Sequence, residues 1–231
     1  MAHVLPPPPT VAVPVAGTAD TFPVNRVYCV GRNYVEHAIE MGHSGREAPF
    51  FFMKPADALV VVAEGETGEI AYPPGTSDLH HEIELVVAIG EGGSNIAAAD
   101  AGRHVWGYAV GLDMTRRDLQ GEAKKQGRPW EIGKAFDQSA PIGPIRKASG
   151  SAPMAGGAIA LDVNGAKRQA SDVSKLIWSV AEIIEHLSKY WTLKPGDLIF
   201  TGTPEGVAAV QRGDLLEGRV DGVGALKVRV R

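Results

Sequence analysis

Apolar residues recur in short runs along the chain, and Gly, Pro and Asp separate one run from the next. The clearest run covers residues 83–89, where Ile83, Leu85, Val87 and Ile89 alternate with their neighbours and would share one face of a strand. Further runs with the character of strands cover residues 26–30, 50–53, 59–62, 106–112, 198–201 and 226–230. The pattern predicts a chain with many strands.

The strongest helical pattern lies late in the chain. Ser179 and Glu182 have the Ser-x-x-Glu spacing of a capping box. Apolar residues follow at helical spacing, namely Val180, Ile183, Ile184, Leu187 and Trp191. A turn at residues 194–197 then ends this helix, and a second, short helix is predicted over residues 34–41. Helices are therefore few beside the strands.

The domain organisation follows from length and from the first residues. A chain of 231 residues favours one large domain, and we find no internal repeat and no linker. Pro6–Pro9 cannot donate backbone hydrogen bonds. We therefore interpret residues 1–21 as an N-terminal arm or edge strand and residues 22–231 as a single catalytic domain. A ligand for a proline-recognition module is the alternative interpretation of the proline stretch.

Composition excludes several classes of partner. The net charge is −4 and no block of Lys or Arg occurs, which argues against a nucleic-acid partner. Cys29 is the only cysteine, so no disulfide can form within the chain. No run reaches the roughly 18 apolar residues of a membrane span, and the first residues do not resemble a signal peptide. We therefore expect a cytoplasmic protein that binds no membrane.

Two acidic residues occur on the clearest strand. Glu82 and Glu84 share the face opposite Ile83, and this face continues with Val86 and Ala88, which suggests that it is also covered. Two like charges about 7 Å apart on a covered face are costly unless a cation compensates them. The same spacing also occurs in solvent-facing Glu-x-Glu pairs, so the pair alone leaves both interpretations open.

A third carboxylate favours a metal. Asp113 ends the strand at 106–112, and the residues on its face of that strand, Gly107, Ala109 and Gly111, are small. Such a face would leave room for a bound group. Three carboxylates without cysteine or a histidine pair form an all-oxygen site, which suits Mg²⁺, Mn²⁺ or Ca²⁺ rather than Zn²⁺. Vacant coordination positions would then accept water and a chelating substrate.

Seven ordered sequence blocks carry a resemblance to a known family. They are VGRNY at 30–34 with His37, FMKP at 52–55, HEIEL at 81–85, GLD at 111–113 with Arg117, Asp118 and Gln120, KAFD at 134–137, LKPGD at 193–197 and TGTPEGV at 201–207. The chain resembles the fumarylacetoacetate hydrolase family from about residue 22 to residue 231. The run at 50–55 and the double histidine at 80–81 are most similar to its branch of fumarylpyruvate and acylpyruvate hydrolases.

The resemblance implies a fold and a cofactor. The fold would be mainly β with peripheral helices (α+β), a mixed β-sandwich or roll like the family's C-terminal domain, assembled as a homodimer. Glu82, Glu84 and Asp113 would hold Mg²⁺ or Mn²⁺, with Ca²⁺ an alternative in crystals.

The resemblance also assigns roles to site residues. His37 and Glu40 match a pair that activates water, and their i, i+3 spacing places both on one helix face. Lys134 would stabilise a developing enolate. Candidates for binding the substrate are Arg32, Arg117, Gln120, Gly202 and Thr203. Asp137 is a weaker candidate for a supporting role.

The expected function is hydrolysis of a carbon–carbon bond in a 2,4-diketo acid, with fumarylpyruvate giving fumarate and pyruvate in gentisate degradation. Alternatives with the same enolate chemistry are oxaloacetate decarboxylation and isomerisation or decarboxylation of a hydroxydienedioate. A protein that binds metabolites without catalysis is a further alternative, although binding alone needs no water-activating pair.

Overall fold

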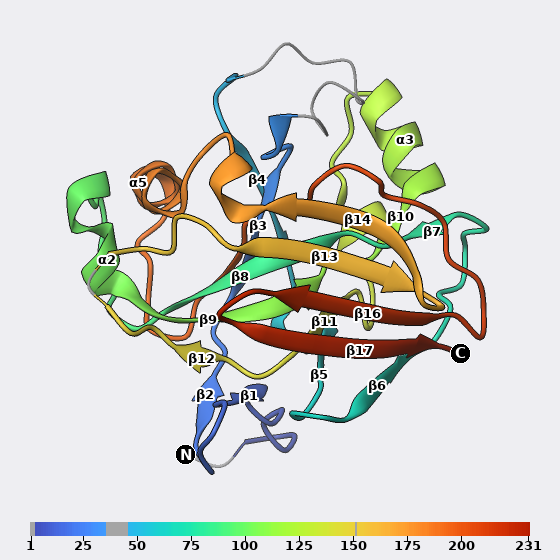
Figure 1. Ribbon diagram of the computed structural model, residues 1–231, viewed down its shortest axis with the longest axis horizontal. Coiled ribbons are helices and arrows are strands. Elements are labelled where there is room, and N and C mark those ends of the chain that lie inside the picture. The colour runs from blue at the N-terminus through green and yellow to red at the C-terminus, as the bar shows by residue number, and fades with distance from the viewer. Residues whose placement is uncertain (1–2, 36–45, 151) are drawn as a thin grey trace.

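The computed structural model of the protein describes residues 3–35, 46–150 and 152–231 (Figure 1). Its strands form two main sheets. The eight-stranded sheet has the order β4 (Phe50–Lys54), β3 (Val27–Gly31), β15 (Leu198–Phe200), β8 (Ile83–Ile89), β9 (Val105–Leu112), β11 (Ala140–Ile142) and β5 (Leu59–Val61), and β12 (Arg146–Lys147) also pairs with β9. The five-stranded sheet has the order β14 (Ala166–Asp172), β13 (Ala158–Val163), β16 (Leu215–Val220), β17 (Gly224–Val230) and β6 (Thr67–Ile70).

Short elements surround these sheets. Two strand pairs join β1 (Ala12–Pro14) to β2 (Thr21–Pro23) and β7 (Leu79–His80) to β10 (Thr115–Arg116). The α-helices are α2 (Ala101–His104), α3 (Arg117–Lys125), α4 (Glu131–Lys134) and α5 (Val180–Tyr190), and the 3-10 helices are Ala56–Ala58, Ala98–Asp100 and Val173–Lys175. The mainly β fold with peripheral helices is confirmed.

Strand β8 is buried on both faces, as its sequence pattern predicts. Ile83, Leu85, Val87 and Ile89 pack into one core cluster, together with apolar residues of α5 and the five-stranded sheet. Val86 and Ala88 belong to a second cluster on the other face, which residues of the β1–β2 hairpin help to cover. Any charged residue on β8 therefore lies inside the protein.

The small residues of β9 serve packing. A Cβ atom added to Gly111 would lie 2.6 Å from both the Phe200 ring and Val86 Cγ2, and one added to Gly107 would meet the backbone of Arg146. Phe200 and β12 therefore occupy the space beside these glycines. The prediction that this face leaves room for a bound group is wrong, because protein atoms fill it.

Helix α5 begins as the sequence predicts. The Ser179 hydroxyl accepts a hydrogen bond from Glu182 N, and the Glu182 carboxylate accepts one from Ser179 N, so the capping box is complete. The apolar residues of the helix face the larger core cluster. Most of the predicted helix at 34–41 lies outside the described residues.

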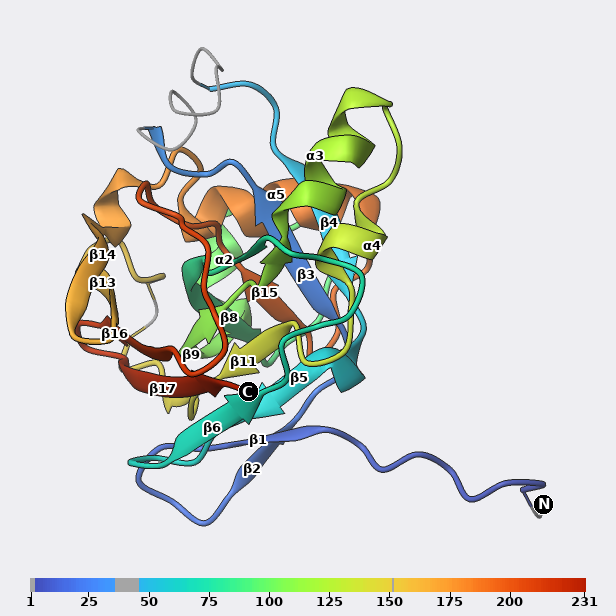
Figure 2. The same ribbon diagram turned by 90° about the vertical axis from the view of Figure 1, so that its right-hand side faces the viewer.

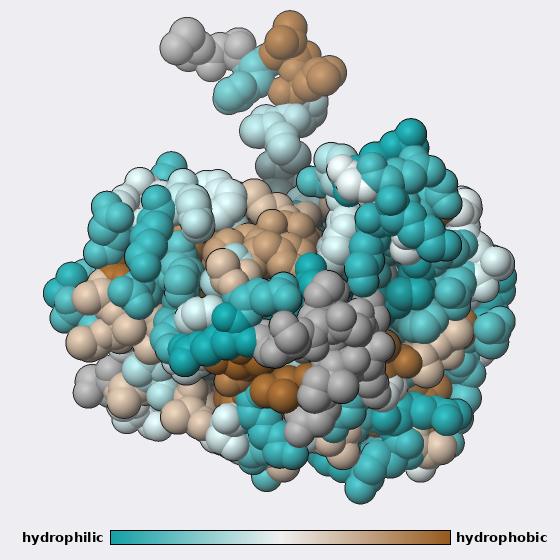
Figure 3. Space-filling model, turned by 90° about the horizontal axis from the view of Figure 1, so that it is seen from above, coloured by the Kyte–Doolittle hydropathy of each residue, from teal (hydrophilic) through white to brown (hydrophobic). Residues whose placement is uncertain are grey.

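The N-terminal segment is attached through its hairpin. Ala16 N donates to Ile145 O at 2.9 Å, and Ile145 N donates to Pro14 O at 2.8 Å. Val13 and Val15 are buried. Residues 3–11, which precede the hairpin, project away from the body (Figures 2 and 3). Among the described helices, none has the length and apolar character to cross a membrane.

Candidate active site

Two neighbouring strands bring three carboxylates together. In the antiparallel pairing of β8 with β9, Glu84 lies opposite Gly111, and Asp113 N donates to Glu82 O at 2.9 Å just beyond the strands. Carboxylate oxygens of Glu82, Glu84 and Asp113 lie within 4.8 Å of one another. All three residues are buried, with exposures of 5%, 2% and 1%. The interpretation of Glu82 and Glu84 as a solvent-facing pair is therefore excluded.

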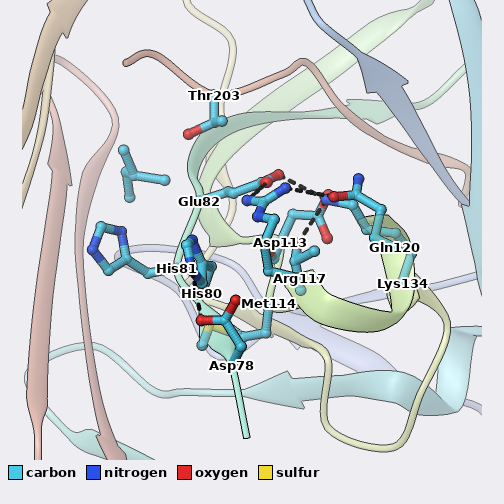
Figure 4. A network of polar contacts seen from close by, with 12 residues as sticks. Asp78, His80, His81, Glu82, Asp113, Met114, Arg117, Gln120, Lys134 and Thr203 are labelled. Carbon is cyan, nitrogen blue, oxygen red and sulfur yellow. Dashed lines mark hydrogen bonds and ion pairs between the residues drawn. The ribbon is translucent and has the colours of Figure 1, made fainter. Parts of the chain in front are cut away.

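A buried lysine lies between two of these carboxylates. Lys134 Nζ, from the end of α4, donates to Glu82 Oε2 at 2.7 Å, to Asp113 Oδ2 at 2.6 Å and to Thr115 Oγ1 at 2.7 Å (Figure 4). Burial opposes its charge, but the attraction of Asp113 and Glu82 outweighs burial and raises the Lys134 pKa. The ammonium group is therefore held charged inside the protein.

Two further cations contact the same acids. Lys54 Nζ, at the end of β4, lies 2.9 Å from Asp113 Oδ1, and Lys54 is 1% exposed. Arg117 pairs with Glu82 and donates to Gln120 Oε1 at 2.6 Å (Figure 4). Arg117 is thus paired with an acidic residue of the protein.

Glu84 differs from the other two acids. Its Oε2 accepts a hydrogen bond from Gly202 N at 2.7 Å, and no cation among the described residues forms an ion pair with it. Burial, followed by the charges of Asp113 and Glu82, raises the Glu84 pKa well above its ordinary value. A divalent cation would offset this cost, so the donor set fits a hard metal ion.

A pocket opens beside the carboxylates. Besides the three acids, Lys134 and Arg117, the residues that line it are Val30, Gly31, Arg32, Phe52, Gln120, Trp130 and Thr203. The Arg32 guanidinium lies 4.7 Å from the centre of the Phe50 ring, and Phe50 meets Trp130 edge to face at 5.1 Å. Within the described residues, Arg32 has no carboxylate partner. It is therefore the pocket cation available to an anionic ligand.

The loop after β15 is held close to Glu84. Gly202 has φ +99°, and an added Cβ would lie 2.7 Å from Asn33 Cβ, so a side chain would clash there. Asn33 Nδ2 donates to Thr201 O at 2.8 Å, and Asn33 Oδ1 accepts from Trp178 N at 2.8 Å. The Gly202 amide, considered above for the substrate, binds Glu84 instead, whereas Thr203 lines the pocket.

The remaining predicted residues are His37, Glu40 and Asp137. His37 and Glu40 are outside the described residues, so their roles stay a prediction. Asp137 is exposed and lines no part of the pocket.

Sequence reasoning missed Lys54, Thr115 and Trp130 as parts of the site. The signal for Lys54 was present, because it is a charged residue that ends an otherwise apolar strand of aromatic residues. Thr115 and Trp130 carry no comparable signal, since their positions depend on how β10 and α4 fold back onto the carboxylates.

Comparison with known proteins agrees with this fold and site. Residues 26–231 match the family described as fumarylacetoacetate (FAA) hydrolase C-terminal. The chain belongs to the fumarylacetoacetate hydrolase family.

Within the family, the chain is similar to two fumarylpyruvate hydrolases and to an oxaloacetate tautomerase. The chain is 49% identical to the fumarylpyruvate hydrolase of a Ralstonia species over 189 residues, which cover 80% of this chain and 93% of that protein. It is 59% identical to a fumarylpyruvate hydrolase from Pseudomonas aeruginosa whose crystal structure contains Mn²⁺ and pyruvate, with a TM-score of 0.97 and coverage of 99% of both chains. The oxaloacetate tautomerase YcgM of Escherichia coli (strain K12) is 40% identical over 202 residues, 87% of this chain and 90% of that protein.

Proposed function

We propose that this protein is a metal-dependent hydrolase that converts fumarylpyruvate and water to fumarate and pyruvate. The observation that carries the proposal is the buried cluster of Glu82, Glu84 and Asp113, in which Glu84 forms no ion pair with a cation of the described residues and has a raised pKa because of burial. The resemblance to two fumarylpyruvate hydrolases supports the choice of substrate.

The charges of the cluster support this substrate. Three carboxylates face three cations, Lys54, Lys134 and Arg117, so the formal charges of these groups cancel. A divalent ion held by Glu82, Glu84 and Asp113 would leave a charge of about +2. Fumarylpyruvate carries two carboxylates, which would offset this charge. When bound, the ion would act as a Lewis acid that stabilises negative charge on substrate oxygens.

The side chains of the chain supply the remaining chemistry. His37, oriented by Glu40, takes a proton from water, and the resulting hydroxide attacks carbon 4 of the diketo acid. The bond between carbons 3 and 4 then breaks, and its electron pair forms pyruvate enolate, which a proton converts to pyruvate. Lys134, whose charge is held beside the acids, stabilises the enolate. Arg32, which lines the pocket, would bind the distal carboxylate.

The direct test is whether cleavage of fumarylpyruvate depends on a divalent metal. Purified protein stripped of metal should not cleave fumarylpyruvate, and Mn²⁺ or Mg²⁺ should restore cleavage, followed as release of fumarate and pyruvate. Full activity without a divalent ion contradicts the proposal. Other acylpyruvates, assayed in the same way, define the substrate range.

The second candidate is oxaloacetate tautomerisation. It is favoured by the relatives of that name, of which the Escherichia coli protein is 40% identical over 202 residues. Tautomerisation moves a proton and needs no attacking water. Conversion between keto and enol oxaloacetate that exceeds fumarylpyruvate cleavage in kcat/KM would favour this candidate.

The variant His37→Ala tests the proposed general base. If His37 is the general base, its loss should slow fumarylpyruvate cleavage by about 10²–10⁴-fold. Steady-state cleavage rates under saturating Mn²⁺ measure this change. An unaltered rate would remove His37 from the mechanism while leaving the metal site in place.

We also propose that the protein is a cytoplasmic homodimer that serves the breakdown of aromatic compounds. A single buried, free thiol at Cys29 is compatible with a reducing compartment. Light scattering of the full chain during gel filtration tests the dimer.

A further inference from the structure

A glutamine outside the pocket connects the second sheet to the candidate site. Gln169 lies on β14 and is the one buried residue of that strand. The register with β13 shifts here, since Leu161 faces Gln169 and Asp162 faces Lys167, which leaves Arg168 without an opposite residue. This bulge turns Gln169 inward, as bulges beside active sites do.

The contacts of Gln169 use its whole amide group. Its oxygen accepts from Ile83 N at 3.1 Å and lies 2.9 Å from His81 Nδ1. Its nitrogen donates to Thr203 Oγ1 at 2.9 Å and to Pro204 O at 2.8 Å. Because a backbone amide can only donate, the contact with Ile83 fixes which end of the side chain is oxygen. Both acceptor positions of the Gln169 side-chain oxygen and both N–H donors of its nitrogen are therefore used.

This arrangement decides how the Thr203 hydroxyl behaves. A hydroxyl that accepts from Gln169 Nε2 keeps its own hydrogen for another acceptor. Thr203 is 3% exposed and lines the same pocket as Glu82 and Glu84. Its hydrogen is therefore available to an anionic oxygen in that pocket, and it needs no reorientation when such a ligand arrives.

We propose that Gln169 is a positioning residue, which sets the Thr203 hydroxyl as a donor to the carboxylate of the bound keto acid. Gln169 thus acts on the ligand through Thr203 and touches no reacting atom. The inference rests on the proposed function in its choice of ligand.

The test uses pyruvate as the probe and the Mn²⁺-loaded full chain, with calorimetry as the readout. Thr203→Val should weaken pyruvate binding by about 10-fold or more, the range for a hydrogen bond to a charged group. Gln169→Met removes the donor and should weaken binding by a smaller factor. Gln169→Glu has a similar shape, but its carboxylate would accept the Thr203 hydrogen. It should therefore weaken pyruvate binding more than Gln169→Met does.

Double variants decide between positioning and mere structural support. In a Thr203→Val background, both Gln169 substitutions should cost nothing further, because the hydroxyl that they act through is gone. Losses that multiply would overturn the inference. Equal losses for Gln169→Met and Gln169→Glu, or a parallel loss of Mn²⁺ affinity, would also overturn it. If the wild-type protein fails to bind pyruvate, the proposed function fails, and the inference with it.

Ser171→Ala is the matched control. Ser171 lies two residues further along β14, and its hydroxyl has no hydrogen-bond partner within the part of the chain that the structure describes. This variant should bind pyruvate as the wild type does. A loss equal to that of Gln169→Met would show that β14 tolerates no change, and would contradict a specific role for Gln169.

Discussion

Replacing Glu84 by Gln should abolish metal-dependent turnover and, at the same time, stabilise the metal-free protein. Glu84 is buried beside two other carboxylates, and no described cation is bonded to it. A neutral amide of similar shape removes the repulsion, with an expected gain of about 1–3 kcal/mol in the free energy of unfolding at neutral pH. Mn²⁺ affinity should fall by at least about 100-fold, because replacing a residue that only supports a metal ligand already lowers metal affinity by up to that factor.

The dependence on pH follows from the raised pKa of Glu84, which burial and then Asp113 and Glu82 cause. The folded protein holds this proton more tightly than the unfolded chain does. In the metal-free wild type, the stabilisation from Glu84 is complete below the ordinary carboxyl pKa of about 4.3, and it is lost as pH rises through the raised value. The advantage of Glu84→Gln should therefore grow over that range and then level off.

Urea unfolding across pH, with and without Mn²⁺, measures these effects. Excess Mn²⁺ should stabilise the wild type by about 2.7 kcal/mol at 100 times its dissociation constant, and the variant far less. The stability advantage of the variant should therefore shrink when metal is added. A metal-free variant that is less stable than the wild type at neutral pH would contradict the interpretation of Glu84 as an uncompensated acid.

Local patterns predicted the half of the fold that carries the metal candidates. Alternation and apolar residues on both faces predict strand β8, and the capping box and the helical spacing of apolar residues predict α5. Glu82, Glu84 and Asp113 lie close together because β8 and β9 are neighbours in the sheet. The charge pattern was therefore enough to single out these three acids, whereas their contact depends on the strand order that the structure shows.

The rest of the five-stranded sheet gave weaker signals. Strand β14 has one buried residue, so its sequence lacks the alternation of a half-buried strand, and β13 and β16 were also not predicted. Gln169 is polar on a mostly exposed strand, and its importance depends on a bulge and on contacts with residues far along the chain. Tertiary contacts of this kind leave no periodic trace in the sequence.

Replacing Lys134 by Met should separate metal binding from turnover. Lys134 Nζ binds Glu82, Asp113 and Thr115, so its removal takes one ion-pair partner from each of two acids inside the protein. Breaking such a buried ion pair should cost about 3–5 kcal/mol of stability in the metal-free protein. A cation beside the metal ligands repels a dication, so the variant should bind Mn²⁺ at least as tightly as the wild type.

Turnover should nevertheless fall, because the charge that stabilises the enolate is gone. We expect kcat for fumarylpyruvate to decrease by about 10²–10³-fold, the usual cost of removing one group that stabilises an oxyanion. Mn²⁺ titration, unfolding with and without metal, and steady-state kinetics at saturating Mn²⁺ give the three quantities. Lys124→Met, at an exposed position on α3, is the matched control and should change none of them. If Lys134→Met lost Mn²⁺ affinity and turnover in parallel, Lys134 would act by holding the acids in place, and its direct role toward the enolate would be contradicted.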